Sequence, residues 1–433
     1  MEKLLRKIER REANVVVVGV GYVGLPLAVE LARAGFAVTG YDKDPEKVRR
    51  LGRAESYIDD IRSAELEPLV DAGKLTASAD LGVLEAADAI VVCVPTPLSK
   101  NKDPDMSFVT QAMEEIAERQ HAEMLIVLES TTYPGTTREV LAPTLTRGIY
   151  ELGKDVFVAF SPERVDPGNA RWKTRNTPKV IGGMTPACLA VGRALYGAII
   201  DTLVPVGSTD TAEMVKLFEN TFRAVNIGLV NEVALMSRRL GVDVWEVIRA
   251  AATKPFGFMP FYPGPGLGGH CIPIDPLYLS WRMRGLKYQA RFIDVADSIN
   301  SAMPGEVVSL VHESLNRRRV PANGAKVLVA GVAYKKDVAD YRESPAIDVI
   351  HGLRSLGAEV DYVDRHVPEV REHGLELRSV CPSVDYGRYD AVVVVTDHSD
   401  TDYARMLSES KLIVDTRDAL RTLDGDKSKV VRL

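Results

Sequence analysis

The chain has 433 residues, of which 46% are hydrophobic and 26% charged, and its formal net charge at pH 7 is -6. This length allows two or three domains with separate cores, and the composition is that of ordinary globular proteins. The net negative charge offers no basic surface, so we expect neither nucleic acid nor an anionic membrane as a partner.

The cysteines and the amino terminus further limit the class of protein to which the chain can belong. The four cysteines lie at positions 93, 188, 271 and 381 and form no CxxC pair, which argues against a disulfide framework and against a zinc site. We therefore expect no metal. Residues 1–12 are charged throughout, and no apolar run reaches the length of a membrane span, so we expect a cytoplasmic protein. Residues 1–12 form either a short amphipathic helix, with Leu4, Leu5 and Ile8 on one side, or a solvated extension.

The first recognisable unit is a strand, a glycine turn and a helix. A β-branched run at 15–18 leads into the turn, and residues 25–34 have helical character. This arrangement places a pyrophosphate at the amino end of a helix. A second apolar run, 37–41, ends in Asp42, where an acid binds a ribose diol and repels a 2'-phosphate. The pattern predicts NAD rather than NADP, bound at a turn that contains Gly19, Gly21 and Gly24.

Three more strands follow at the spacing of a parallel sheet, at residues 89–94, 125–128 and 156–160. Each ends in a polar, turn-rich segment. Because ligands of open parallel sheets lie at the carboxyl ends of the strands, we expect these segments to line one crevice. Turn formation alone accounts for the prolines in them but not for the polar side chains gathered at one end of the sheet, which are Ser130, Thr131, Thr132 and Glu163.

The middle of the chain is helical. Residues 210–240 repeat apolar side chains at helical spacing, and Lys216 and Asn220 share one helix face. For a lone Lys and Asn a solvated face is the usual explanation. A second helical region, 291–318, contains Pro304, which begins a new turn or bends the helix.

Residues 254–281 are rich in Pro and Gly and surround one thiol, Cys271. Glycines let the backbone approach a ligand, and prolines reduce the entropy lost on ordering. Cys271 is then either a nucleophile on a rigid turn, with Asp275 four residues later, or a small buried hydrophobe.

The last third repeats the strand, loop, helix and strand series without the spaced glycines. A strand at 326–330 is followed by a loop with Lys335, Lys336 and Arg342, which suits a phosphate or a carboxylate. A helix through 356 and a strand at 359–363 follow, and the runs 391–395 and 412–414 complete a smaller sheet. We predict an α/β fold of two Rossmann-like parallel-sheet domains (1–207 and 319–433) joined by a helical middle region (208–318).

Taken together, these segments resemble the UDP-glucose/GDP-mannose dehydrogenase family over nearly the whole chain. The matching pieces are GVGYVGLP at 19–26, VPTP at 94–97, STTYPGTT at 130–137, SPER at 161–164, the pair Lys216 and Asn220, GGHC at 268–271 and YKKDVADYRESPA at 334–346. The resemblance implies a four-electron oxidation of a nucleotide sugar's primary alcohol to a carboxylate with two NAD+. Cys271 would capture the aldehyde as a thiohemiacetal, which is oxidised to a thioester and hydrolysed.

The same resemblance implies roles for individual residues. Lys216 and Asn220 would stabilise oxyanion charge, Asp275 would assist proton transfer through water, and Glu163 would be the base for thioester hydrolysis, with Thr131 orienting the water. The implied cofactor site is Gly19, Gly21, Tyr22, Val23, Gly24, Asp42, Pro95, Thr96, Ser130, Thr131 and Arg342. The implied substrate site is Glu163, Lys216, Asn220, Tyr262, Gly268, Gly269, Tyr334 and Lys335.

Two differences from the sequence pattern of the UDP-glucose branch narrow the choice of substrate. The UDP-glucose branch carries Ser before the nucleophile and an Arg in the preceding loop that reaches the partner subunit's site, whereas this chain has His270 and no Arg between 250 and 281. The loop resembles that of bacterial enzymes acting on UDP-N-acetylhexosamines for surface polysaccharides. We expect UDP-N-acetylglucosamine as substrate. UDP-N-acetylmannosamine, UDP-N-acetylgalactosamine and UDP-glucose remain alternatives, because sequence does not resolve epimers. The resemblance also implies a homodimer or higher homo-oligomer.

Overall fold

The computed structural model describes residues 1–58, 60–99, 102–147, 149–166, 168–169, 171–269, 271–372, 374–380 and 384–433, so His270 and Cys381 lie outside the described residues. The chain divides into two compact units. The first comprises Met1–Glu219 and Leu277–Tyr288, and the second comprises Asn220–Pro276 and Gln289–Leu433. None of the helices within the described ranges is both long enough and apolar enough to span a bilayer.

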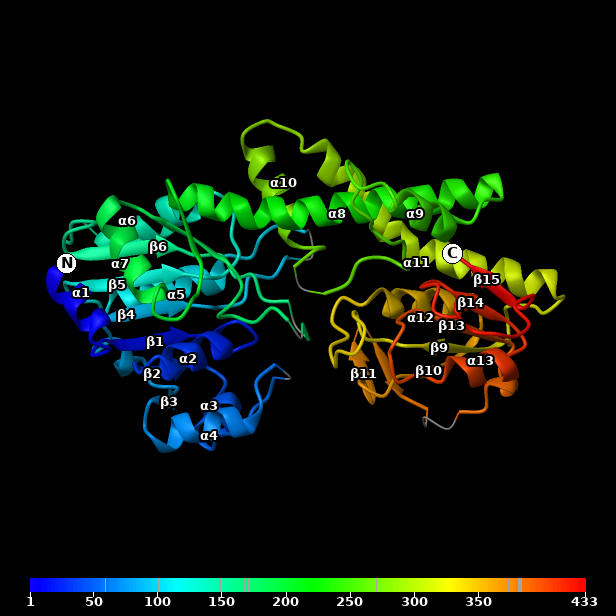
Figure 1. The fold of residues 1–433 in the computed structure, drawn as a ribbon, viewed down its shortest axis with the longest axis horizontal. Coiled ribbons are helices and arrows are strands. Elements are labelled where there is room, and N and C mark those ends of the chain that lie inside the picture. The colour runs from blue at the N-terminus through cyan, green and yellow to red at the C-terminus, as the bar shows by residue number, and fades with distance from the viewer. Residues whose placement is uncertain are drawn as a thin grey trace. The chain divides into compact units, whose positions relative to one another are not determined.

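Helices and strands alternate through most of both units (Figure 1). The helices are α1 Glu2–Glu9, α2 Gly24–Arg33, α3 Pro45–Gly52, α4 Ser63–Asp71, α5 Ser107–Ala117, α6 Ala142–Thr146, α7 Pro186–Tyr196, α8 Thr209–Leu240, α9 Val244–Ala251, α10 Asp275–Gly285, α11 Arg291–Arg317, α12 Pro345–Ser355 and α13 Tyr403–Glu409. The strands are β1 Asn14–Val18, β2 Ala37–Tyr41, β3 Leu75–Ser78, β4 Ala89–Val92, β5 Met124–Leu128, β6 Val156–Phe160, β7 Lys179–Gly183, β8 Leu203–Val206, β9 Lys326–Ala330, β10 Glu359–Val363, β11 Glu369–Glu372, β12 Leu375–Arg378, β13 Ala391–Val394, β14 Ile413–Asp415 and β15 Val430–Arg432.

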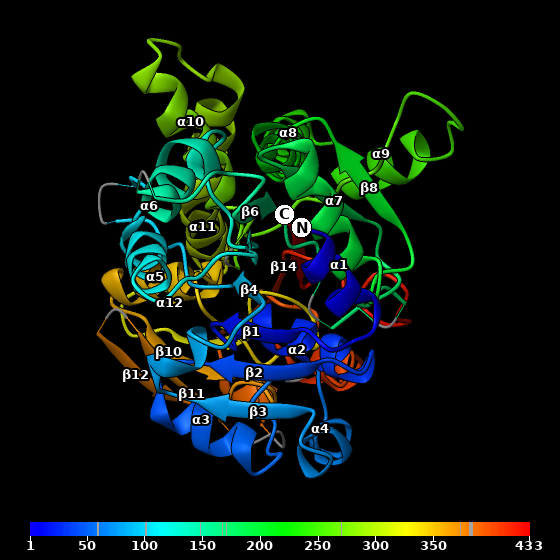
Figure 2. The ribbon, with the colours of Figure 1, turned by 90° about the vertical axis from the view of Figure 1, so that its left-hand side faces the viewer.

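The first unit is organised around a sheet of order β3-β2-β1-β4-β5-β6-β7-β8. From β3 to β6 this is the strand order of dinucleotide-binding folds, and β3 lies at the edge beside α3 and α4 (Figure 2). All its strand pairs are parallel except β6 with β7. No helix is found between those two strands in the described residues, and a parallel return needs a crossover.

Alternating side chains of the central strands feed two cores. Val15 and Val17 of β1 pack with apolar residues of α1, α2 and α7, whereas Val16 and Val18 pack with residues of α5. Helix α1 belongs to the first core because Leu4 and Ile8 are buried there. Of the two interpretations of residues 1–12, the amphipathic helix is therefore the observed one.

The second unit contains a smaller, entirely parallel sheet of order β10-β9-β13-β14-β15 and a separate hairpin of β11 and β12. Apolar residues of α11 and α12 pack on one face of the sheet, and those of α13 pack on the other (Figure 1). The order β10-β9-β13 corresponds to β2-β1-β4 of the first unit. The predicted α/β fold with two parallel-sheet domains and a helical middle is confirmed.

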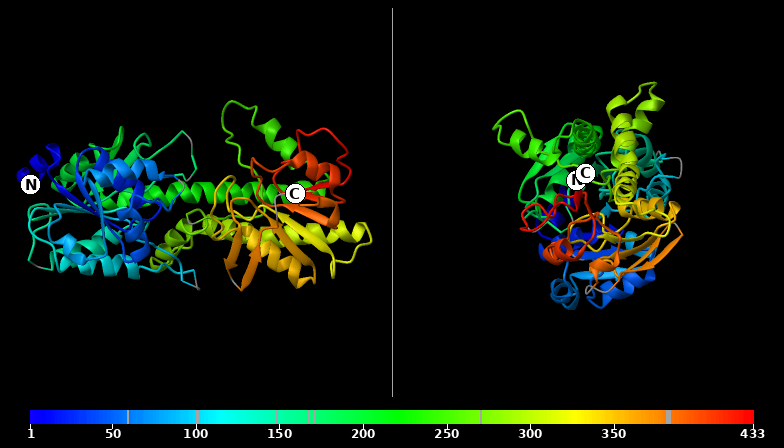
Figure 3. Two further views of the ribbon diagram at one scale, coloured as in Figure 1. Left: turned by 90° about the horizontal axis from the view of Figure 1, so that it is seen from below. Right: turned by 90° about the vertical axis from the view of Figure 1, so that its right-hand side faces the viewer.

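Helices α8 and α11 are continuous and lie against each other (Figure 3). Asn231 Nδ2 donates to Asn300 Oδ1 at 2.9 Å, and Asn300 Nδ2 donates to the carbonyl of Ala224 at 3.1 Å. A Cβ at Gly228 would lie 3.2 Å from the Cα of Ala296, so the glycine permits this close approach. Helix α11 continues through Pro304.

Candidate active site

The glycine turn after β1 has the conformation that a dinucleotide site needs. Gly19 has φ +88°, and a Cβ there would lie 2.5 Å from the carbonyl oxygen of Cys93, so only glycine fits. A Cβ at Gly21 would meet nothing within 4 Å. Protein packing thus leaves room against the Gly21 backbone that a ligand can use. Helix α2 begins at Gly24, and its N-cap residue Val23 makes no side-chain cap, which leaves backbone N–H groups for an anion.

Asp42 follows β2 beside this turn. Its Oδ2 accepts from the backbone N–H of Val20 at 3.1 Å, and its Oδ1 accepts from that of Asp44 at 3.0 Å. Lys47 Nζ lies 3.2 Å from Oδ2. These contacts orient the carboxylate at the edge of the turn, where the sequence predicts the ribose of NAD.

The segments after β4 and β5 meet as predicted. Ser130 Oγ donates to the carbonyl of Val94 at 2.8 Å, which joins the two strand ends. Buried Tyr278 of α10 donates its hydroxyl to the carbonyl of Thr96 at 2.9 Å. Pro95 therefore lies between two anchored positions, and Thr131 follows Ser130 as a half-buried residue.

Lys216 and Glu163 form a buried pair in the first unit. Lys216 Nζ lies 2.8 Å from the carbonyl oxygen of Glu163 and 3.2 Å from its Oε2. Both side chains are at most 10% exposed. The other carboxylate oxygen of Glu163, Oε1, is buried without a hydrogen-bond partner among the described residues. A buried acceptor of this kind has capacity for a water or a substrate hydroxyl.

A second buried ion pair, which the sequence analysis did not predict, holds the segment that precedes Glu163. Lys179 Nζ donates to Glu129 Oε2 at 2.7 Å and to the carbonyl of Pro162 at 3.0 Å, and the Tyr196 hydroxyl donates to Glu129 Oε1. Burial raises the pKa of Glu129, although Lys179 and Tyr196 oppose the shift. Both ends of the ion pair line a pocket together with Glu163. The only signal in the sequence is a charged residue at the border of each of two apolar strands, Glu129 after β5 and Lys179 at the start of β7.

A second buried acid, Glu213 of α8, holds the turn that follows Thr131. It accepts hydrogen bonds from the backbone N–H of Gly135 at 2.6 Å and from the N–H and hydroxyl of Thr137 at 2.8 and 2.7 Å. Burial raises the pKa of Glu213 to about 7, against the opposing effect of these donors. The sequence pattern of α8 placed Lys216 and Asn220 but gave no role to Glu213.

The glycine-rich loop before Cys271 packs against the loop after β9 within the second unit. A Cβ at Gly268 would lie 2.8 Å from the Cβ of Tyr334, and a Cβ at Gly269, which has φ +84°, would lie 2.7 Å from the Tyr334 ring. The predicted substrate residues Gly268, Gly269 and Tyr334 are thus in contact, with half-buried Lys335 next in the chain. Only glycines permit this approach.

Cys271 stands at the start of a turn that leads into α10. Its carbonyl accepts from the backbone N–H of Asp275 at 2.8 Å, and the Asp275 carboxylate accepts from Asn220 Nδ2 at 2.5 Å. Asp275 is 3% exposed and Asn220 9%. Cys271 is a half-buried thiol. The arrangement links the predicted nucleophile, through its own backbone, to a buried amide and carboxylate pair.

Two further predicted residues have contacts of their own in the second unit. Arg342 pairs with Asp340, with Nε to Oδ1 at 2.9 Å and Nη2 to Oδ2 at 2.8 Å. Tyr262 stacks on Trp245 with ring centroids 6.3 Å apart. Contact of Arg342 with NAD and of Tyr262 with the sugar nucleotide remain predictions.

Sequence profiles of one family match three successive parts of the chain. The NAD binding domain of the UDP-glucose/GDP-mannose dehydrogenase family matches residues 13–200, its central domain matches 210–302, and its UDP binding domain matches 328–422. The chain belongs to this family. Since the matched first domain binds NAD and the turn around Gly21 fits a dinucleotide, the cofactor of this dehydrogenase is NAD. The turn around Gly21 would hold NAD, which would supply the acceptor for the substrate's hydride.

Individual relatives cover almost the full length of the chain. The UDP-N-acetyl-D-glucosamine 6-dehydrogenase of Pseudomonas aeruginosa is 32% identical over 96% of this chain and 99% of its own. The UDP-N-acetyl-D-mannosamine dehydrogenase of Pyrococcus horikoshii is 34% identical over 94% and 96%. The NDP-N-acetyl-D-galactosaminuronic acid dehydrogenase of Ralstonia solanacearum is 34% identical over 95% and 97%. A solved structure of the Pyrococcus horikoshii UDP-N-acetyl-D-mannosamine dehydrogenase superposes with a TM-score of 0.86 at 32% identity, covering 97% of this chain and 98% of that one.

The position of Asp42 predicts how a substitution changes cofactor choice. Asp42→Asn keeps an acceptor for the Val20 N–H but removes the charge that repels a 2'-phosphate, while Lys47 remains nearby. We expect the ratio of NADPH to NADH dissociation constants, measured by nucleotide fluorescence, to fall by roughly tenfold or more. Asp44→Asn is the matched control, because Asp44 caps α3 and has no predicted role at the ribose. An unchanged ratio in Asp42→Asn would remove Asp42 from the cofactor site.

Proposed function

We propose that this NAD-dependent nucleotide-sugar dehydrogenase oxidises the primary alcohol of UDP-N-acetylglucosamine to the uronate, with two NAD+ per sugar, for surface polysaccharide synthesis. The four-electron oxidation is supported by the placement of Cys271. This residue is a half-buried thiol on a turn whose backbone is hydrogen-bonded to Asp275, and the glycines before it pack on Tyr334. A two-electron dehydrogenase has no use for a thiol.

In the proposed reaction the residues act in sequence. After the first hydride leaves the hydroxymethyl carbon, the Cys271 sulfur bonds to the resulting aldehyde carbon, and Lys216 and Asn220 stabilise the negative charge that develops on the oxygen. A second hydride then leaves the same carbon and a proton leaves the oxygen, which yields a thioester. Water attacks the thioester and the thiolate departs. Each oxidation removes one hydride and one proton, so the alcohol becomes a carboxylate after the addition of water.

We assign the removal of a proton from that water to Glu163. The pair with Lys216 fixes the position of this carboxylate, and its buried Oε1 accepts no hydrogen bond from the described residues. An oriented acceptor with spare capacity is what a general base requires. Thr131 is proposed to orient the water, and Asp275, held by Asn220, to assist proton transfer through a water.

The choice of sugar rests on the loop sequence and on the relatives. Two relatives that are named as UDP-N-acetyl-D-glucosamine 6-dehydrogenases, from Pseudomonas aeruginosa and Salmonella typhi, are each 32% identical to this chain. Relatives named for the mannosamine and galactosaminuronic acid compounds are 34% identical, so identity alone supports these epimers equally well. We retain UDP-N-acetylglucosamine because the Cys271 loop departs from the UDP-glucose branch and resembles most closely that of UDP-N-acetylglucosamine 6-dehydrogenases.

A comparison of four substrates tests the choice of sugar. We expect kcat/KM for UDP-N-acetylglucosamine to exceed that for UDP-N-acetylmannosamine, UDP-N-acetylgalactosamine and UDP-glucose by about tenfold or more, since a misplaced or missing polar group leaves its partner unpaired. A higher kcat/KM for another of the four would identify that sugar as the substrate and would leave the proposed chemistry unchanged.

The role of Glu163 predicts a covalent intermediate. In Glu163→Gln the thioester should be hydrolysed about 10²–10⁴ times more slowly, because the amide cannot take the proton from water. Intact mass spectrometry after mixing with UDP-sugar and NAD+ should then show a sugar nucleotide on Cys271. Glu219→Gln, which changes an exposed acid of α8, the helix that carries Lys216, should show none. A fully active Glu163→Gln chain without adduct would exclude this role.

We also propose that the chain pairs with a second copy through α8. Phe222, Leu229 and Met236 recur every seven residues on this helix and are 44%, 57% and 50% exposed. A stripe with this period suits packing against another helix, and exposed apolar surface of this kind marks an interface.

The proposed stripe predicts the effect of a charge within it. Leu229→Glu should lower the mass measured by light scattering from two chains to one at micromolar concentration, because a carboxylate would be buried without a partner. Leu286→Glu is the matched control, since Leu286 is 62% exposed but lies outside α8. A parent of one-chain mass, or a Leu229→Glu variant that keeps the mass of two chains, would contradict the proposal.

A further inference from the structure

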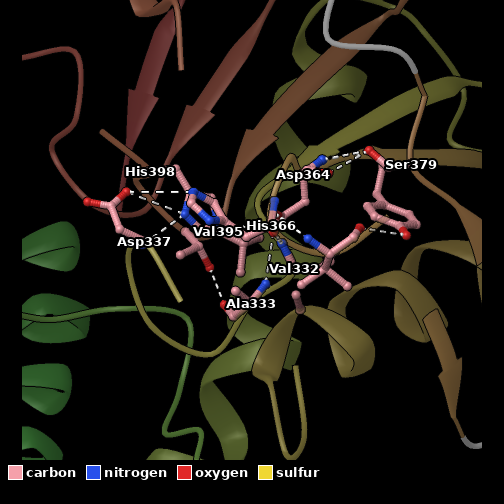
Figure 4. Close-up of polar contacts among 12 residues, drawn as sticks. Val332, Ala333, Asp337, Asp364, His366, Ser379, Val395 and His398 are labelled. Atoms are coloured by element: carbon pink, nitrogen blue, oxygen red, sulfur yellow. Dashed lines mark hydrogen bonds and ion pairs between the residues drawn. The ribbon is translucent and has the colours of Figure 1, made fainter. Parts of the chain in front are cut away.

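Three potential ligands of a metal ion converge at the carboxyl ends of the strands of the last domain (Figure 4). Asp337 comes from the loop after β9, His366 from the loop after β10 and His398 from the loop after β13. One ligand atom from each residue lies within 4.8 Å of the other two. No role at the NAD site or in the proposed oxidation uses any of them.

His398 has the environment of a metal-binding histidine. Its Nε2 lies 3.0 Å from Oδ2 of Asp364, whose side chain is fully buried. A carboxylate on one ring nitrogen fixes the tautomer and directs the lone pair of the other nitrogen outward, as in carboxylate, histidine and metal triads. That lone pair, on Nδ1, points toward Asp337: it accepts the backbone N–H of Asp337 at 3.0 Å and lies 3.7 Å from Asp337 Oδ1.

The other two candidate ligands are Asp337 and His366. Asp337 accepts hydrogen bonds from the N–H and the hydroxyl of Ser399, both at 2.7 Å. Although the His366 side chain is 29% exposed, its Nε2 is buried and has no hydrogen-bond partner among the described residues. This nitrogen lies 4.0 Å from Oδ1 of Asp337 and 3.7 Å from Oδ1 of Asp400.

The electrostatic surroundings favour a cation. The carboxylates of Asp337, Asp364 and Asp400 face the two imidazoles, whose rings stack with centroids 4.6 Å apart. Cations on the same loops include Lys336, which pairs with Asp397 at 3.6 Å, Arg365, which pairs with Asp400 at 3.7 Å, and Arg342, which pairs with Asp340 at 2.8 Å. Lys335 also lies on the loop after β9. Two stacked imidazolium ions would repel each other, whereas one ion bound by two neutral imidazoles would neutralise the carboxylates without this repulsion.

From this geometry we propose that Asp337, His366 and His398 form a binding site for a divalent transition-metal ion of the zinc class. Bonds of about 2.0–2.1 Å in a tetrahedral site place ligand atoms about 3.3 Å apart. The distances of 3.7 and 4.0 Å must therefore shorten by roughly 0.4 and 0.7 Å, and the distance between the two histidine nitrogens, which is at most 4.8 Å, by up to about 1.5 Å. Binding would replace the hydrogen bond from the Asp337 N–H to His398. A set of two nitrogens and one carboxylate oxygen suits Zn²⁺, Co²⁺ and Ni²⁺ better than Mg²⁺ or Ca²⁺. The ion would join three loops, one of which carries Tyr334 and Lys335.

Cobalt titration of the full-length protein tests the site. After treatment with a chelator, we expect the chain to bind one Co²⁺ with visible absorption of a low-coordinate complex, and Zn²⁺ to displace it. His366→Gln and Asp337→Asn should each weaken binding by about tenfold or more. His312→Gln, at an exposed histidine of α11, should leave binding unchanged. The same titrations in a Cys271→Ser chain remove the thiol, which binds these ions as well.

The binding measurements on the parent and the variants decide whether the site exists. Saturable binding that persists in Cys271→Ser and is lost in His366→Gln and Asp337→Asn supports the site, provided that the metal-free variants melt at the temperature of the parent. Absence of saturable binding in the parent overturns the proposal. So does binding that Cys271→Ser abolishes, or that both site variants retain.

Discussion

The buried ammonium of Lys179 is the contact on which the arrangement of the first unit's site depends. It binds the carboxylate of Glu129, which directly precedes Ser130, and the carbonyl of Pro162, which directly precedes Glu163. One cation thus joins the end of β5 to the segment after β6, which includes the partner of Lys216. Removal of one member of such a buried pair typically costs about 3–5 kcal/mol, because the other charge is left without compensation. The two segments therefore keep a common geometry through a group that takes no part in the proposed chemistry.

The two parallel-sheet domains use the same local structure for different purposes. Gly19 and Gly331 both follow the first strand of their sheet with φ near +85° (+88° and +82°), and in each domain an acid at the end of the next strand, Asp42 or Asp364, accepts backbone N–H groups of the turn. In the first domain the acid stands beside a turn that fits NAD. In the last domain Asp364 is fully buried and also accepts from His398. A carboxylate that is occupied in this way is not available to a ribose.

Much of this structure could be predicted from sequence because local patterns determine it. Apolar runs such as 37–41 and 359–363 became the observed strands β2 and β10, and the glycine turn followed from the steric limits of any other residue at Gly19. The pair of Lys216 with Glu163 could not be derived from pattern, because the two residues are 53 positions apart and only the folded sheet brings them together. The antiparallel step from β6 to β7 was also missed, since a short apolar run does not encode its direction.

Asp337, His366 and His398 show the same limit, because they are about 30 residues apart in sequence and meet only where parallel strands gather their loops at one edge. Cysteine spacing, on which the expectation of no metal rests, is a local signal and does not reach such a cluster; that expectation stays a prediction. Similarly, no sequence pattern predicted the burial of Glu213, which raises its pKa to about 7.

The central claim, a four-electron oxidation through Cys271, is tested most directly by counting NADH formed per UDP-N-acetylglucosamine consumed, in the parent and in Cys271→Ala. We predict two NADH per sugar in the parent, and loss of this stoichiometry in the variant. One NADH per sugar in both proteins would contradict it and would make Cys271 a structural residue.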